Sequence, residues 1–248
     1  MRTRVFKILG LIVLSTGLLL PACRSGSDGT TGASGKAKKD LPKLIAKGTS
    51  EDGLSVSLQN KNIGLKGVRL LANTEAIKNV KFLALKNNML GDEGLAVLSE
   101  STTFQHVEKL FLWDNQITPK GIQSLIASKH FNGLKQLNLM KNQLGDEGVI
   151  QLVQSEKMDS IILLDLGGNA ISDEGAIAIA NSPHLRNLKR LDLFRNNIGP
   201  KGIEALITST HLPNLEYLDL TANAVRPEEM PALEKKANMP NLKFLIIQ

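Results

Sequence analysis

Residues 137–148 read L-N-L-M-K-N-Q-L-G-D-E-G, and this stretch recurs with substitutions along most of the chain. The position of Leu137 is filled by an aliphatic residue at every interval of 27 residues. The residues at this position are Val56, Leu83, Leu110, Leu137, Leu164, Leu191, Leu218 and Leu245. A fixed period between about 20 and 50 residues is the signature of a solenoid, in which each unit packs mainly against its neighbours. The repeat therefore determines the predicted fold.

The first half of each unit predicts a very short strand. Two apolar residues separated by one, such as Leu83 and Leu85, open the unit, and this alternation is typical of a strand with one buried face. An asparagine follows at a fixed distance, at Asn88, Asn115, Asn142, Asn169, Asn196 and Asn223. An amide side chain both donates and accepts hydrogen bonds, so it can satisfy backbone groups where the chain leaves the strand. We interpret this column as structural.

The second half of each unit predicts a short helix. The expected N-cap position is filled by Gly91, Thr118, Gly145, Ser172 and Gly199, and proline or aspartate often comes next, as helix starts favour. Apolar residues then follow at helical spacing. A glycine also recurs near each helix start, for example at Gly121 and Gly175. Because glycine lowers helix propensity, its repetition predicts close packing between neighbouring helices.

This pattern resembles the leucine-rich repeat LxLxxNxL over residues 54–248, and the G-D-E-G helix start resembles the ribonuclease-inhibitor-like class of these repeats. The resemblance implies an α/β solenoid, a horseshoe with a short-stranded parallel sheet on its concave side and helices on its convex side. The different spacings of strands and helices also predict a curved stack. Strands stack about 4.8 Å apart and helices about 8–10 Å apart, so the stack must curve with its strands inside.

Residues 1–22 predict a signal peptide. A basic start is followed by an apolar run from Ile8 to Ala22. This run is shorter than the roughly 20 residues that a membrane-spanning helix needs, but it fits a secretory signal.

Residues 20–23 read L-P-A-C and resemble a bacterial lipobox. The resemblance implies that Cys23, the only cysteine in the chain, is lipidated and anchors the exported protein to the bacterial cell envelope. Arg24 follows where an acidic residue would favour the inner membrane, so the outer membrane is the expected location. An ordinary cleaved signal peptide with a chance cysteine is the alternative.

The rest of the chain divides into three predicted parts. Residues 23–40 begin with the lipidated cysteine and continue as a flexible tether, because they are rich in small and polar residues. Residues 41–53 predict an N-terminal capping half-repeat, whose helix is marked by Asp40 and Gly48. Residues 54–248 form the predicted leucine-rich repeat domain of seven full units and a final strand.

The net charge of +6 is concentrated before the repeats. Seven of the 30 Lys and Arg residues but two of the 24 Asp and Glu residues lie before Leu41. Residues 41–248 therefore carry 23 basic and 22 acidic residues, which argues against a nucleic-acid partner. Acidic and basic residues nearly alternate at one helix-start position, including Glu93, Lys120 and Glu147, which predicts weak ion pairs between neighbouring units.

Large apolar side chains stand at strand positions that face away from the core. Phe111, Trp113, Met140 and Phe194 are examples, and exposed aromatic residues beside charges are typical anchors of protein interfaces. We therefore predict a concave face that binds a protein or peptide. Its candidate residues are Phe82, Lys109, Phe111, Trp113, Asn138, Met140, Asp165, Arg190, Asp192, Phe194, Arg195, Tyr217 and Asp219. The alternative is that these side chains pack on each other and bind nothing.

Other chemistry receives little support. Asp165, Asp192 and Asp219 share one column that could hold a cation or a basic group, although aspartate is common there in leucine-rich repeats. Three histidines on the convex rim lack fixed carboxylate or cysteine companions, so we predict no metal site. No phosphate-binding loop or H-E-x-x-H motif occurs, so the sequence predicts neither an enzyme nor a cofactor.

The sequence therefore predicts a non-catalytic, membrane-anchored recognition scaffold that is monomeric and binds a protein or peptide. One alternative is a structural envelope protein that self-associates through the final strand, residues 244–248. Another is an inhibitor of a secreted enzyme, which rests on analogy with the repeat class alone.

Overall fold

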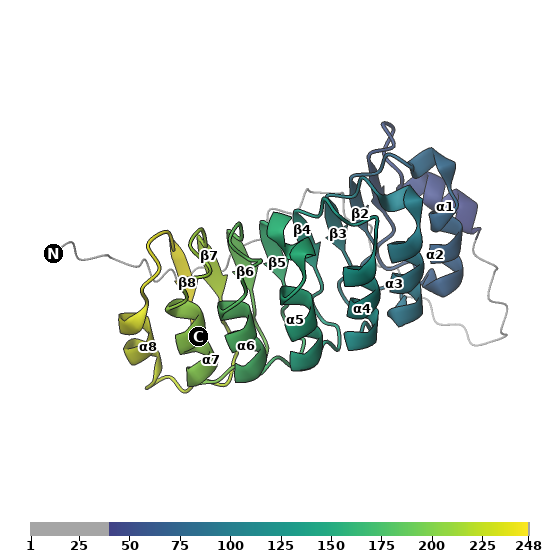
Figure 1. The fold of residues 1–248 in the computed structure, drawn as a ribbon. Helices are drawn as coiled ribbons and strands as arrows, with labels where there is room; N and C mark the ends of the chain where they lie inside the picture. Colours follow the sequence, from purple (N-terminus) through teal and green to yellow (C-terminus); the bar gives the residue numbers. More distant parts are fainter. Residues whose placement is uncertain (1–39, 248) are drawn as a thin grey trace, which may run out of the picture.

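Eight short strands and eight α-helices alternate along residues 40–247, the part of the chain that this computed structural model describes (Figure 1). The strands are β1 (Ser55–Ser57), β2 (Phe82–Ala84), β3 (Lys109–Phe111), β4 (Gln136–Asn138), β5 (Leu163–Asp165), β6 (Arg190–Asp192), β7 (Tyr217–Asp219) and β8 (Phe244–Ile246). The α-helices are α1 (Leu41–Gly48), α2 (Gly64–Ala72), α3 (Gly91–Glu100), α4 (Pro119–Ala127), α5 (Gly145–Val153), α6 (Asp173–Ala180), α7 (Pro200–Ile207) and α8 (Met230–Lys236). Three 3-10 helices complete these elements, namely η1 (Glu75–Ile77), η2 (Thr102–Phe104) and η3 (Glu156–Ser160).

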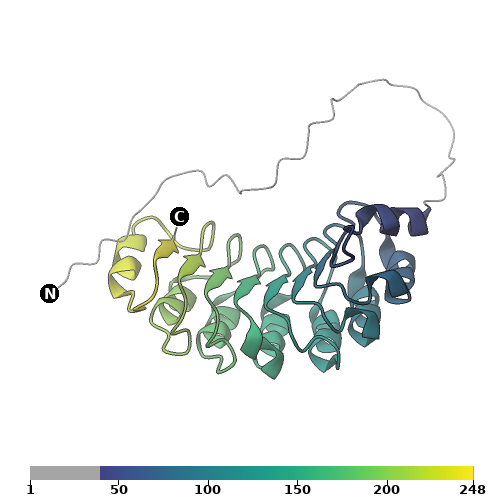
Figure 2. The ribbon, with the colours of Figure 1, turned by 90° about the horizontal axis from the view of Figure 1, so that it is seen from above.

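The strands form one parallel sheet in chain order, from β1 to β8. Its register follows the repeat, since Leu83 pairs with Leu110 and Leu110 with Leu137. Figure 2 shows the strands along the inner side of a gentle arc and the helices along its outer side. The predicted α/β solenoid, with its 27-residue period, concave sheet and convex helices, is confirmed.

The core is one continuous apolar layer between the sheet and the helices, and it extends from Ile45 to Ile247. The strand leucines and the inward helix residues, such as Leu95 and Leu98, are fully buried. Each buried leucine stabilises the fold by roughly 1.5–3 kcal/mol relative to an exposed one. Because each unit contributes only a few such residues, the core exists only when the units stack.

The asparagine column seals the bend after each strand. The side-chain oxygen of Asn115 accepts a hydrogen bond from the Asn88 N–H (3.0 Å) in the preceding unit. Its amide group donates to the carbonyls of Leu85 (2.9 Å) and Leu112 (3.0 Å). The asparagines from Asn88 to Asn196 are buried and join neighbouring units in this way, and Asn223 does so from a partly buried position, which confirms the structural interpretation.

The helix starts differ in part from the prediction. Thr118, Ser172 and Gly199 are N-caps as expected. Gly91 and Gly145 instead lie one residue inside their helices, at φ values of 61° and 55°. Glycine adopts this left-handed conformation without a steric penalty, so the two glycines serve the turn rather than the cap.

Aspartates from the preceding unit supply helix caps that the sequence analysis did not predict. The Asp92 carboxylate on α3 accepts from the N–H (2.8 Å) and hydroxyl (2.7 Å) of Thr118, at the start of α4. Asp146 caps α6 in the same way through Ser172. A Cβ at Gly121 would come within 2.5 Å of the Asp92 carboxylate, and one at Gly175 equally close to that of Asp146, so these glycines make room for the aspartates. Close packing between neighbouring helices is confirmed.

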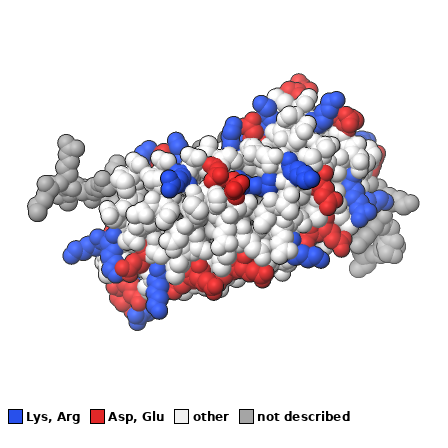
Figure 3. Space-filling view, in the orientation of Figure 1, with Lys and Arg blue, Asp and Glu red and all other residues white. Residues whose placement is uncertain are grey.

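The predicted ion pairs between helix starts were wrong. In residues 40–247, the pairs between neighbouring units lie mostly in the loops before the strands, and one joins Glu204 on α7 to Lys236 on α8. Glu108 contacts Lys81 (3.7 Å) and Lys135 (2.8 Å), and Glu216 occupies the equivalent position among lysines farther along the arc. In the face shown in Figure 3, basic and acidic side chains are interspersed around a largely uncharged middle.

Residues 1–39 lie outside the described part of the chain, and so do the predicted signal peptide, the lipidated Cys23 and nearly all of the tether. Among the helices of residues 40–247, none combines the length and apolar character needed to cross a bilayer.

Candidate functional site

The outward side of the sheet, which we call the concave face, consists of three side-chain columns. Strand pairing places Phe111 beside Asn138, and Asn138 beside Asp165. A second column, two residues earlier on each strand, includes Phe82, Lys109, Arg190 and Tyr217. A third column, two residues after the first, includes Trp113, Met140 and Phe194. The structure therefore brings the predicted site residues onto one face, except that the exposed Arg195 lies in the loop beside it.

The N-terminal half of the concave face carries an aromatic–lysine cluster, formed by Phe82, Lys86, Phe111, Trp113 and Lys141. The Lys86 ammonium lies 3.4 Å from the centre of the Trp113 ring, and that of Lys141 lies 5.5 Å from it. Such cation–π contacts contribute roughly 0.5–1 kcal/mol at exposed sites. Neither lysine was among the predicted site residues. Lys86 lies one period before Trp113, but Lys141 lies outside that column and approaches the ring only through the direction of its side chain.

Part of the aromatic surface packs on itself. The rings of Phe82 and Phe111 meet edge to face, with centres 5.1 Å apart. Trp113 remains half-buried, and its indole N–H is buried without a hydrogen-bond partner among the described residues. The alternative of mutual packing therefore holds for the two phenylalanines but leaves the tryptophan with an unused donor.

The polar Asn138 and the apolar Met140 form the centre of the face. Asn138 donates a hydrogen bond of 2.6 Å to the Asp165 carboxylate and accepts one of 3.1 Å from the Met140 N–H. Met140 is half-buried. Because Asn138 uses both ends of its amide within the sheet, it positions Asp165 more than it presents free groups to solvent.

The C-terminal half carries a carboxylate row, formed by Asp165, Asp192 and Asp219 on three neighbouring strands. Each accepts a hydrogen bond from the N–H two residues further along, at distances of 3.2, 3.2 and 2.9 Å respectively. These bonds fix the carboxylates in place. In residues 40–247 the basic side chain paired with the row is Arg190, at 3.8 Å from Asp192, and its guanidinium also stacks on the Tyr217 ring (3.7 Å).

Burial changes the proton affinity of this row. Burial raises the pKa of Asp165 to about 6. Burial, together with the negative charges of Asp165 and Asp219, raises the pKa of Asp192 to about 7. Loss of hydration disfavours the charged form of an acid, and neighbouring negative charges act in the same direction. Near neutral pH the row therefore holds protons that ordinary aspartates have lost.

Phe194 covers the gap left by a glycine. Its ring lies against Gly167 on the neighbouring unit, where any Cβ would clash with it. Phe194 is thus half-buried in the face rather than fully presented to solvent. Of the two face aromatics with a polar group, Tyr217 bonds to Asp219 through its hydroxyl, whereas the buried indole N–H of Trp113 has no partner in residues 40–247.

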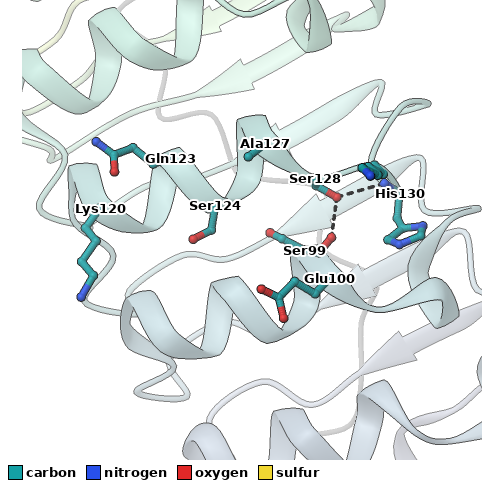
Figure 4. A pocket seen from close by; sticks show the side chains of 9 residues that line it. Ser99, Glu100, Lys120, Gln123, Ser124, Ala127, Ser128 and His130 are labelled. Atoms are coloured by element: carbon teal, nitrogen blue, oxygen red, sulfur yellow. Dashed lines mark hydrogen bonds between the residues drawn. The ribbon is translucent and has the colours of Figure 1, made fainter.

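The convex side contains a hollow of about 560 Å³ between α3 and α4 (Figure 4). Its lining residues are Ser99, Glu100, Lys120, Gln123, Ser124, Ala127, Ser128, Lys129 and His130. The Ser128 hydroxyl donates to the Ser99 carbonyl (2.5 Å) and accepts from the His130 N–H (3.0 Å). These bonds join two neighbouring units, so we interpret the hollow as part of the seam between helices.

The three histidines of the convex rim are His130, His184 and His211. His184 lies 3.0 Å from Asp159 through its Nδ1. Across residues 40–247, no three His, Cys, Asp or Glu side chains are grouped so that they could hold a metal ion.

The geometry defines an open solenoid that presents a structured face on its inner side. A family model for the leucine-rich repeat matches residues 134–153, 161–180 and 184–206. The match covers three of the repeats, and the fold of residues 40–247 is that of a leucine-rich repeat solenoid.

Solved structures with similar folds include internalin C2 from Listeria monocytogenes, with 21% identity, a TM-score of 0.50, and coverage of 79% of this chain and 80% of that one. An internalin named inlF from the same organism shows 21% identity and a TM-score of 0.43, and covers 68% of this chain and 42% of that one. Actin-binding site 2 of leiomodin-1 shows 20% identity and a TM-score of 0.40, and covers 47% of this chain and 72% of that one. No curated protein sequence matches the chain. At these identities the likeness concerns the fold alone.

Proposed function

We propose that this protein is a non-catalytic recognition scaffold that binds a protein or peptide through the concave face, as a monomer anchored to the bacterial envelope. The observation that carries the proposal is the position of Trp113. The core is complete without it, because Leu110 and Leu112, the inward residues next to Trp113, are fully buried. Trp113 nevertheless lies on the outward face, half-buried, with the Lys86 ammonium over its ring.

The face has the size and composition of a binding surface. Eight strands spaced about 4.8 Å apart span about 34 Å, which is long enough for the roughly 800 Å² that each partner buries in an ordinary interface. Tryptophan, tyrosine and arginine dominate the binding energy of such interfaces. All three residue types occur here, at Trp113, Tyr217 and Arg190.

Crosslinked capture from the native envelope tests this function. We expect Trp113→Ser to lose the captured partner while its unfolding midpoint stays close to that of the wild type. The matched control is Ile177→Ser, which removes an apolar side chain that is 40% exposed on α6. Equal capture by the wild type and the Trp113 variant would contradict the proposal.

The envelope anchor is a separate part of the proposal. It rests on the L-P-A-C stretch at residues 20–23 and on the signal-like segment before it. Palmitate labelling in a bacterial host should mark the wild type and spare Cys23→Ala. Labelling of both would refute lipidation at Cys23.

We also assign the repeats to the ribonuclease-inhibitor-like class, on the G-D-E-G helix starts at Gly91 and Gly145.

A further inference from the structure

The concave face has opposite charge at its two ends. Lys86 and Lys141 stack on Trp113, and within residues 40–247 neither ammonium forms an ion pair with a carboxylate. The carboxylate row at the other end has three acids and one guanidinium, that of Arg190. The guanidinium lies 3.8 Å from the Asp192 carboxylate, which is long for an ion pair. Each end therefore has charge that the protein itself does not neutralise.

The distance between the two ends follows from the sheet. Trp113 lies just after β3, and Asp192, at the middle of the carboxylate row, lies on β6. Three strand spacings and one two-residue step along a strand separate them, which amounts to about 16 Å. An extended peptide advances about 3.3 Å per residue, so about five residues of a bound segment would cover this distance.

We propose that the partner presents one extended segment to the concave face, with an acidic side chain at the aromatic–lysine cluster and a basic side chain about five residues away at the carboxylate row. This inference rests on the proposed function, since it names the kind of partner that the face accepts. The apolar part of the segment would lie over Met140 and over the Phe194 ring, which covers Gly167 of the unit between them.

Other occupants fit the face less well. An apolar segment would bury the carboxylate row without a partner, and burial of unpaired charge is costly. A nucleic acid would bring phosphates against the same carboxylates. A basic side chain, in contrast, forms charge-assisted hydrogen bonds with acids that are already fixed by backbone N–H groups.

Binding should also depend on pH. The groups facing the carboxylate row are Asn138, Arg190 and Tyr217. A bound cation favours the ionised acids, whereas acidification protonates them because their pKa values are raised. Affinity for a segment with a basic end should therefore fall as the pH is lowered from about 8 to about 5.5.

Synthetic peptides with an apolar centre and defined charges test the inference on the full chain in detergent. The main probe carries Glu and Arg about five residues apart, and the comparison peptides carry the same pair closer together, two Glu or two Arg. We expect the main probe to bind at least about tenfold more tightly than the others at low salt. Lys141→Glu and Asp192→Asn should each remove this preference, and Lys201→Glu on the convex helix α7 should leave it unchanged.

The outcomes separate the two proposals. If all peptides bind equally and Trp113→Ser weakens them all, the concave face binds peptides but the charge rule is wrong. If no peptide binds, and Trp113→Ser also leaves capture from the envelope unchanged, both the charge rule and the proposed function fail. Circular dichroism of each variant shows whether a loss of binding reflects misfolding.

Discussion

At the scale of single residues, two columns of polar side chains have different roles in this protein. The asparagine column lies inside the bend and satisfies backbone groups, whereas the aspartates of the carboxylate row lie at the surface of the sheet. The sequence pattern was sufficient to predict the first role, because one residue type recurs at one position. It did not predict the proton affinity of the row, which depends on burial by side chains from three strands.

Asn115→Ala should destabilise the protein by about 2–4 kcal/mol. The change leaves the Asn88 N–H and the Leu85 carbonyl without their side-chain partner, whereas the Leu112 carbonyl keeps the bond from Asn142. Each unsatisfied buried group costs roughly 1–3 kcal/mol. Urea unfolding monitored by circular dichroism measures the effect. Asn223→Ala is the matched control, because Asn223 is only partly buried and should cost less.

Asp192→Asn should stabilise the protein at pH 8 and change little at pH 4. The pKa of Asp192 is raised to about 7 in the folded state, above its value of about 3.9 in an unfolded chain. The folded state therefore binds the proton more tightly, and stability falls as the pH rises from about 4 to about 7. The gain at pH 8 is on the order of a few kcal/mol, since the side chain is only 16% exposed.

Urea unfolding at pH 4, 6 and 8 checks this expectation. Asp114→Asn, at an exposed turn position, is the control and should differ little from the wild type at each pH. A stability difference at Asp192 that stays constant across the three pH values would show that the raised pKa is not its cause.

At the scale of elements, the starts of α4, α6 and α7 each depend on an aspartate of the helix before them. The sequence analysis placed aspartate in the first turn because a helix dipole favours negative charge there. The structure adds that Asp92 and Asp146 bond to the start of the following helix. This contact joins residues 26 positions apart, so the local pattern of one helix could not indicate it. Gly121, which makes room for the Asp92 carboxylate, indicated close packing between helices but not which side chain packs there.

Asp92→Ala should destabilise the protein by about 1–2 kcal/mol, because α4 loses the carboxylate that caps it. The adjacent and exposed Glu93→Ala is the matched control, with an expected change within about 0.5 kcal/mol. Thermal unfolding of both variants under the same conditions gives the comparison. An equal loss in the two would mean that general charge, rather than capping, accounts for the effect.

At the scale of the whole molecule, the sequence determined the fold more fully than the site. A period of 27 residues was enough to give the strand register, the single sheet and the core. The candidate face could be predicted as a set of outward columns, but not as two ends of opposite charge. That division depends on Lys86 and Lys141 turning toward Trp113, which spacing alone does not reveal.

Hydrogen exchange should show a gradient along the arc. Each unit packs mainly on its neighbours, and the most deeply buried amides open only through the largest fluctuations. We expect the amides of β3 to β6 to exchange more slowly than those of β8, where Phe244 is 52% exposed. Mass spectrometry of exchanged peptides measures this, and uniform protection from β3 to β8 would contradict it.

Under the proposed charge rule, the constant register of the repeats fixes the distance between the two charged groups of a ligand. One extra 27-residue unit inserted between β4 and β5 would keep every other contact type and move Asp192 about 4.8 Å farther from Trp113. The preferred separation of the acidic and basic groups in a ligand would then grow by about one to two residues. Duplication or loss of whole units would thus be an evolutionary means of retuning ligand length without redesign of the core.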